Sequence, residues 1–104
     1  MKTFVYLIQH GYGGIKIGVS KDPKKRCKQL QTGNQKKLRV IATFSFKSKS
    51  EALIVEELLH RKFAQYRMNG EWFRKSILRK FKDRKILFPK IFNSGMINDY
   101  DEAR

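Results

Sequence analysis

The chain has 104 residues, and its 24 lysines and arginines against nine aspartates and glutamates give a formal charge of +15. This length leaves room for one hydrophobic core, so a single domain is expected. The single cysteine excludes an internal disulfide, and no apolar run approaches the ~20 residues needed to span a bilayer. Without a signal-peptide pattern at its start, the sequence predicts a cytoplasmic protein with no membrane partner.

The positive charge is not uniform along the chain. Three of the nine acids, Asp99, Asp101 and Glu102, lie within the last six residues, so the first 98 residues carry only six. Such a surplus destabilises a compact state by self-repulsion unless a polyanion absorbs it, which makes nucleic acid the expected partner. The alternative is a basic surface that aids solubility or touches acidic lipid.

Two strands and a helix are expected in the first third of the chain. Residues 3–9 form a β-branched and aromatic run, residues 15–20 alternate in polarity, and the glycine-rich stretch between them indicates a hairpin. Asp22 and Pro23 supply an N-cap acceptor and a proline at the first helical position, and they predict a helix over residues 24–31.

A third strand and a longer helix follow. Residues 38–46 alternate so that one face is expected to carry Leu38, Val40, Ala42, Phe44 and Phe46. Ser48 and Glu51 have the spacing of a capping box, which begins a helix expected to run to about Met68. Its apolar stripe has helical spacing and consists of Ala52, Val55, Leu59, Phe63 and Tyr66.

The remaining elements are short. Residues 71–73 form an apolar-aromatic piece, and Ile77 and Phe81 among basic residues indicate one more short helix. The predicted fold is α+β, with a three-stranded antiparallel sheet flanked by helices. We expect residues 1–88 to form the domain and residues 89–104 to be a C-terminal extension, a loosely held acidic tail.

The usual catalytic sets are largely absent. The two histidines, His10 and His60, and one cysteine cannot make a zinc site of three or four ordinary ligands without distant carboxylates, and no glycine-rich phosphate loop is present. What remains is a spaced set on the predicted strands and helices: Tyr6, Ile17, Gly18, Arg26, Glu56 and His60.

This spaced set resembles the GIY-YIG nuclease superfamily, and within it the small phage-type branch. In that family a first-strand tyrosine precedes a second-strand Tyr-Ile-Gly, an arginine on the first helix and a glutamate on a later helix. The corresponding residues here are Val5 and Tyr6, then Lys16, Ile17 and Gly18, then Arg26 and Glu56. The stretches that look like the phage-type branch are KIGVSKDPKKR (16–26), QLQTGN (29–34), EELLHRKF (56–63) and GEWF, which is Gly70, Glu71, Trp72 and Phe73.

The sequence also departs from that family's pattern. Lys16 replaces the second tyrosine, and Phe4 replaces the usual glycine of the first motif. The asparagine that closes the pattern in many members has no clear counterpart, although Glu71 lies in the corresponding region. The resemblance spans residues 3–73, and it implies a metal-dependent DNA endonuclease of low intrinsic sequence specificity. A phage-encoded member would act in the cytoplasm of the host cell.

The chemistry of the residues fits that implication. Hydrolysis of a phosphodiester needs an oriented water, a counter-charge for the pentavalent phosphorus and a metal for the leaving oxygen. Tyr6 is expected to orient or deprotonate the water, Arg26 to bind phosphate oxygens with its planar fork, and Glu56 to bind one Mg²⁺ or Mn²⁺ ion. The alternatives are a core tyrosine, a solvated cation and a solvated helix carboxylate, and the last description fits Glu57 better than Glu56.

Two further residues complete the expected catalytic set, Lys16 and His60, and Lys16 is expected to contact phosphate. His60 hydrogen-bonds a phosphate or a ligand, or it fills the flank of its helix. Trp72 and Phe73 are expected to close the core rather than stack on bases. The residues expected to contact nucleic acid are all basic: Lys16, Lys21, Lys24, Lys25, Arg26, Lys28, Arg67, Lys82 and Lys85.

The preferred interpretation is an endonuclease that acts on double-stranded DNA, as a monomer or a homodimer. The first alternative is a non-catalytic nucleic-acid-binding module of the same fold. A third class, an RNA-binding or host-inhibitory protein, is supported by charge alone.

Binding to duplex DNA should depend strongly on salt. If about six phosphates are neutralised, the release of counterions gives a slope near −5 when the logarithm of affinity is plotted against that of salt concentration. Fluorescence-anisotropy titrations over a series of salt concentrations measure this slope. A slope shallower than about −2 would contradict a polyanionic partner.

Overall fold

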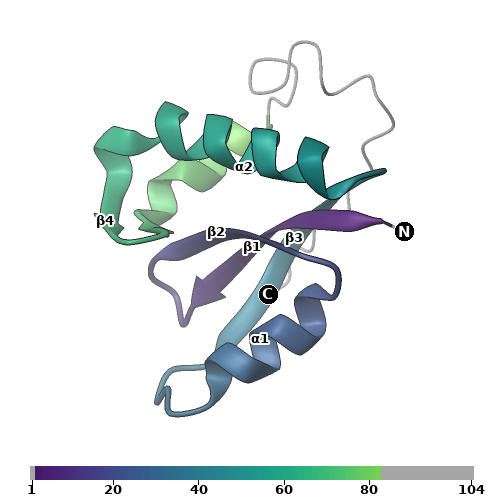
Figure 1. Cartoon of the computed structure of the whole chain (residues 1–104). Coiled ribbons are helices and arrows are strands. Elements are labelled where there is room, and N and C mark those ends of the chain that lie inside the picture. Colours follow the sequence, from purple (N-terminus) through teal and green to yellow (C-terminus); the bar gives the residue numbers. More distant parts are fainter. Residues whose placement is uncertain (1, 83–104) are drawn as a thin grey trace.

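The computed structural model describes residues 2–82, in which an antiparallel sheet lies between helices on its two faces (Figure 1). In chain order the elements are β1 (Thr3–His10), β2 (Ile15–Ser20), α1 (Pro23–Gln31), β3 (Leu38–Phe46), α2 (Lys49–Lys62), η1 (Ala64–Tyr66), β4 (Arg67–Asn69), β5 (Trp72–Phe73) and η2 (Lys75–Lys82), where η marks a 3-10 helix. None of the described helices has the length and apolar character that a membrane span requires. The predicted extension, residues 89–104, lies outside the described residues.

The sheet has five strands in the order β3-β1-β2-β5-β4, and every neighbouring pair is antiparallel. The fold is α+β, as expected, but the expected three-stranded sheet is wrong. The two added strands come from residues 67–73, which form a hairpin around Gly70 at φ +51°. Strands of three and two residues are too short for the alternation that identifies a strand in sequence, and glycine takes this backbone angle without strain.

The same hairpin explains why α2 ends earlier than expected. The helix ends at Lys62 rather than near Met68, and after the turn of η1 the chain becomes extended in β4. The backbone N–H of Arg74 donates to the carbonyl of Tyr66 at 2.8 Å, and β4 pairs with β5. Backbone groups that a longer helix would have paired internally are therefore paired across the hairpin.

A bulge divides β3 between the two faces of the sheet. Leu7 and Ile8 are neighbours in β1, but their partners are Ala42 and Val40, so Ile41 is an extra residue. An inserted residue exchanges the faces of all residues beyond it, and the single apolar face expected for this strand is therefore wrong. The side chains that pack with α1 are Leu38 and Val40, and those that pack with α2 are Ala42, Phe44 and Phe46.

Two apolar clusters hold the helices on the sheet. The larger cluster joins the sheet to α2 and η2, and the smaller one joins it to α1 through Cys27 and Leu30. The predicted stripe of α2 is confirmed, because Ala52, Val55, Leu59 and Phe63 are buried and Tyr66 is partly buried against them. The register of α2 over the sheet fixes where the polar side chains beside that stripe can reach.

Replacing Ser48 by alanine should lower the free energy of unfolding by about 0.5–2 kcal/mol, the usual cost of losing an N-cap. Ser48 Oγ accepts a hydrogen bond from the backbone N–H of Glu51 at 3.2 Å, which satisfies a donor that the first turn of α2 leaves unpaired. Ser50→Ala is the matched control, since Ser50 is exposed in the same turn. Chemical denaturation measures both variants, and equal losses would contradict the capping role.

Candidate active site

The site lies at the edge of β2, beside the N-terminal end of β5, where the pairing between these two strands stops. β5 pairs with β2 only at Ile15 and Lys16, so the next outward-facing backbone groups, those of Ile17, find other partners. The N–H of Ile17 donates to the carbonyl of Glu71 at 3.1 Å, and its carbonyl accepts a hydrogen bond from Nε2 of His60 at 3.1 Å. One residue of β2 therefore ties the β4–β5 hairpin and helix α2 to the same point.

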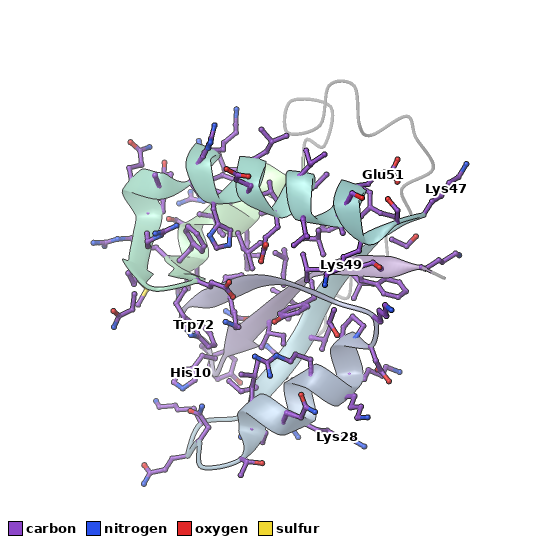
Figure 2. All side chains as sticks on the ribbon, viewed as in Figure 1. His10, Lys28, Lys47, Lys49, Glu51 and Trp72 are labelled. Carbon is purple, nitrogen blue, oxygen red and sulfur yellow. The ribbon has the colours of Figure 1, made fainter. Side chains whose placement is uncertain are left out.

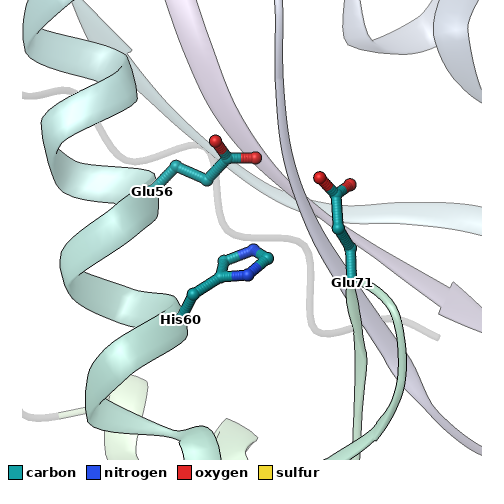
Figure 3. A group of neighbouring side chains, drawn as sticks. All are labelled: Glu56, His60 and Glu71. Carbon is teal, nitrogen blue, oxygen red and sulfur yellow. The ribbon is translucent and has the colours of Figure 1, made fainter.

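This connection brings three potential metal ligands together. Glu56 and His60 from α2 and Glu71 from the hairpin each offer a ligand atom, and these atoms all lie within 4.8 Å of one another. Figure 3 shows the two carboxylates facing each other across the space beside β2. A pocket of about 590 Å³ opens here, lined in part by these three side chains and Arg67.

The sequence predicts Glu71 as part of the GEWF motif, residues 70–73, and not as a metal ligand. The only available signal was its position, in the region where the family's closing asparagine is expected and among few other acids. The hairpin around Gly70 is what turns the Glu71 side chain toward Glu56. Because that hairpin was not predicted, the proximity could not be predicted either.

The environment of Glu56 disfavours its negative charge. Burial raises the pKa of Glu56, and the nearby carboxylate of Glu71 raises it further, while His60 and Lys16 act in the opposite direction. A divalent cation between the two carboxylates would offset both the burial and the repulsion. The donor set therefore fits a hard ion such as Mg²⁺ or Mn²⁺, which prefers oxygen ligands.

His60 is held by hydrogen bonds at both ring nitrogens. Its Nε2 donates to the Ile17 carbonyl, and its Nδ1 accepts from the guanidinium of Arg67 at 3.2 Å. The ring also packs edge-on against Phe73, with the ring centres 5.0 Å apart. These partners assign the proton to Nε2. A role for His60 as a metal ligand would require one of these bonds to break, whereas the carboxylates of Glu56 and Glu71 need no such change.

Tyr6 reaches the site from the other side of the sheet. It is buried in β1 opposite Gly18, where an added Cβ would overlap the tyrosine hydroxyl and ring. Burial raises the pKa of Tyr6, and the guanidinium of Arg26, which hydrogen-bonds the phenol, opposes that shift. Gly18 directly follows Ile17, the residue to which Glu71 and His60 are hydrogen-bonded, so the phenol lies against the same stretch of β2. The carboxylates of Glu71 and Glu56 also raise this pKa.

The basic residues fall into two groups around the site. Lys16 is largely buried, with 12% of its side chain exposed, and its Nζ lies 2.8 Å from Oε1 of Glu71. It therefore neutralises Glu71 directly instead of projecting into solvent. The exposed basic residues on or beside α1 are Lys21, Lys24, Lys25, Arg26 and Lys28, with Arg67 exposed on β4. The side chain of Lys82 and the whole of Lys85 lie outside the described part of the chain.

The basic α+β fold and this site are consistent with a nuclease-like or DNA-binding module. The family model for the T5orf172 domain matches residues 3–86. The chain belongs to the T5orf172 domain family, which is related to the nuclease-like phage domains. No curated protein and no solved structure gave a match to the chain. Membership of the GIY-YIG superfamily itself stays a prediction.

Glu56→Gln should raise the melting temperature of the metal-free protein at neutral pH. The pKa of Glu56 is raised above its usual 4.5 in the folded chain, so this group favours folding below that pH and the contribution is lost as pH rises through the raised pKa. Glutamine has no charge to bury, and its advantage should disappear toward acidic pH. Thermal melts in a chelator over a pH series measure the difference.

The control for this measurement is Glu57→Gln. Glu57 is 65% exposed and pairs with Arg61 at 2.9 Å, so removing its charge relieves no burial. Its melting temperature should stay the same or fall slightly. An equal rise in the two variants would mean that general charge on α2, and not the site, determines the effect.

Proposed function

We propose that this protein is a metal-dependent endonuclease that hydrolyses phosphodiester bonds in DNA. The observation that carries the proposal is the approach of Glu56 and Glu71 just before the start of β5, together with the hydrogen-bonded pair of Tyr6 and Arg26. The chain has a formal charge of +15, which attracts DNA. Two neighbouring carboxylates would repel the DNA phosphates unless a bound cation neutralised them.

Glu56 and Glu71 would hold one Mg²⁺ or Mn²⁺ ion. When bound, such an ion supplies positive charge for the oxygens of the phosphate and the leaving group. Lys16 keeps Glu71 ionised and oriented through its 2.8 Å ion pair, and His60 fixes α2 to the edge of β2. In this proposal His60 is a positioning residue, since its two nitrogens are engaged with Ile17 and Arg67.

Tyr6 and Arg26 act on the reacting groups. Because burial raises the pKa of Tyr6, the neutral phenol is favoured, which supports the orientation of a water molecule over its deprotonation by a tyrosinate. Arg26 is exposed and hydrogen-bonds both Tyr6 and, at 3.4 Å, Oε1 of Gln29. A guanidinium has five N–H donors, so further ones are available to the scissile phosphate. The pair would place water and phosphate side by side.

The exposed lysines on or beside α1 support double-stranded DNA as the substrate. Contacts of Lys21, Lys24, Lys25 and Lys28 with phosphates would orient the duplex without reading its sequence, which supports low intrinsic specificity. We place this activity in the cytoplasm. The alternative function, a DNA-binding module without catalysis, is favoured by Lys16, which stands where the family has a second tyrosine and is already paired with Glu71.

Glu56→Gln should abolish the cleavage of supercoiled plasmid DNA while leaving binding intact or tighter. The substitution removes one negative charge facing the phosphates and one ligand oxygen of the ion. Glu71→Gln should also lower cleavage. Glu57→Gln should change it little, because Glu57 is 65% exposed and already paired with Arg61 at 2.9 Å. Plasmid nicking with and without Mg²⁺ or Mn²⁺, together with anisotropy binding, separates these effects.

Several outcomes would decide between the candidates. A wild-type protein that binds DNA and does not cut it with either ion is the non-catalytic module. Full activity in Glu71→Gln beside an inactive Glu56→Gln would remove Glu71 from the ligand set. Equal loss in the Glu56 and Glu57 variants, with lowered melting temperatures, would indicate that α2 is destabilised and that the metal site should be abandoned.

A further inference from the structure

One corner of the sheet lies beside the site and carries polar and aromatic side chains. Cross-strand pairing places Asn69 opposite Trp72, Trp72 opposite Lys16, and Lys16 opposite Ile8. Directly paired residues project from the same face of a sheet, so these side chains form one row. Ile8 belongs to the apolar cluster under α1, whereas Asn69 at the other end of the row is exposed. The row therefore runs from the core out to solvent.

A pocket of about 310 Å³ lies at this corner, lined by His10, Gly14, Asn34, Met68, Asn69 and Trp72. Figure 2 shows His10 and Trp72 together on the side of the sheet that faces α1. Their rings meet edge to face, with centroids 5.7 Å apart and planes at 76°. His10 is fixed in turn by a hydrogen bond of 3.0 Å between its Nε2 and Oδ1 of Asn34. The Trp72 ring thus has a rigid neighbour within the pocket wall.

We propose that this pocket binds one unstacked nucleobase of the DNA substrate. The proposal rests on the proposed function for its ligand, DNA, and on the pocket for its position. A partly exposed indole offers a flat surface on which any base can stack. Asn69 adds an exposed amide with both donor and acceptor groups, which suits the edge of a base. Met68, which is 57% exposed, lies at the same pocket and supplies a polarisable contact.

Lys16 connects this pocket to the proposed cleavage site. Its Nζ lies 2.8 Å from Oε1 of Glu71 and 5.8 Å from the centre of the Trp72 ring. A base on Trp72 would therefore belong to a nucleotide close to the scissile phosphate, with the positive charge of Lys16 between the two. The two aromatic residues of GEWF then have separate roles, since Phe73 is fully buried in the core.

The test uses the full chain and short DNA duplexes that differ at one extrahelical position. Each duplex carries a single bulged nucleotide with a base, a single bulged abasic nucleotide, or no bulge. We expect the wild type to bind the base-containing bulge roughly 5- to 150-fold more tightly than the abasic one, the range for stacking one base on an aromatic side chain. Trp72→Leu should remove this preference and leave affinity for the abasic duplex unchanged.

Two further variants keep the test decisive. Asn69→Ala alters an exposed side chain and leaves the core intact, and it should reduce the preference for the base-containing bulge several-fold. Tyr12→Leu is the matched control, because Tyr12 is an aromatic residue with 85% exposure that does not line the pocket, and it should keep the wild-type preference. Circular dichroism verifies that each variant is folded.

Failure of this proposal can be distinguished from failure of the proposed function. Equal affinity of the wild type for base-containing and abasic bulges would overturn the base pocket, whether or not the protein cuts plasmid. A preference that persists in both Trp72→Leu and Asn69→Ala, or one that Tyr12→Leu abolishes, would also overturn it. A base preference that depends on Trp72, in a protein without cleavage, would support the pocket and reject the nuclease.

Discussion

The two outward-facing backbone groups of Ile17 determine the geometry of the site. A strand edge presents unpaired N–H and C=O groups, and a β5 strand of two residues leaves those of Ile17 without a strand partner. The N–H of Ile17 donates to the backbone carbonyl of Glu71, and the C=O of Ile17 accepts from Nε2 of His60. Because Glu71 and Glu56 stand on the segments anchored in this way, a requirement for backbone pairing also sets the distance between two carboxylates.

The second constraint is electrostatic: polar and charged groups that are removed from water at the site need partners close by. Each polar group that is taken from water at the site has a partner of suitable character: Lys16 for Glu71, Arg26 for Tyr6, and Arg67 for His60. Glu56 is the exception, since burial and Glu71 both raise its pKa. Such an arrangement stores unfavourable energy in the metal-free protein that a bound cation would release.

Strong local signals in the sequence predict much of the fold. The features that depend on pairing between distant segments have no such signal. The β2 and β3 strands, the Asp22 cap and the α2 stripe follow from alternation, capping and helical spacing over six or more residues. The bulge at Ile41 and the hairpin at Gly70 depend on cross-strand pairing, which no single segment encodes. The structure brings Tyr6, Arg26 and Glu56 toward one place, whereas Glu71 joined them only through the unpredicted hairpin.

The contact between Tyr6 and Gly18 has a consequence for any substitution at position 18. The tyrosine ring occupies the volume that a side chain at position 18 would need, so Tyr6 and Gly18 form one packing unit across two strands. Even a methyl group at position 18 must displace the phenol, although the tyrosine itself is unchanged. The position of the phenol at the site therefore depends on a residue that has no side chain of its own.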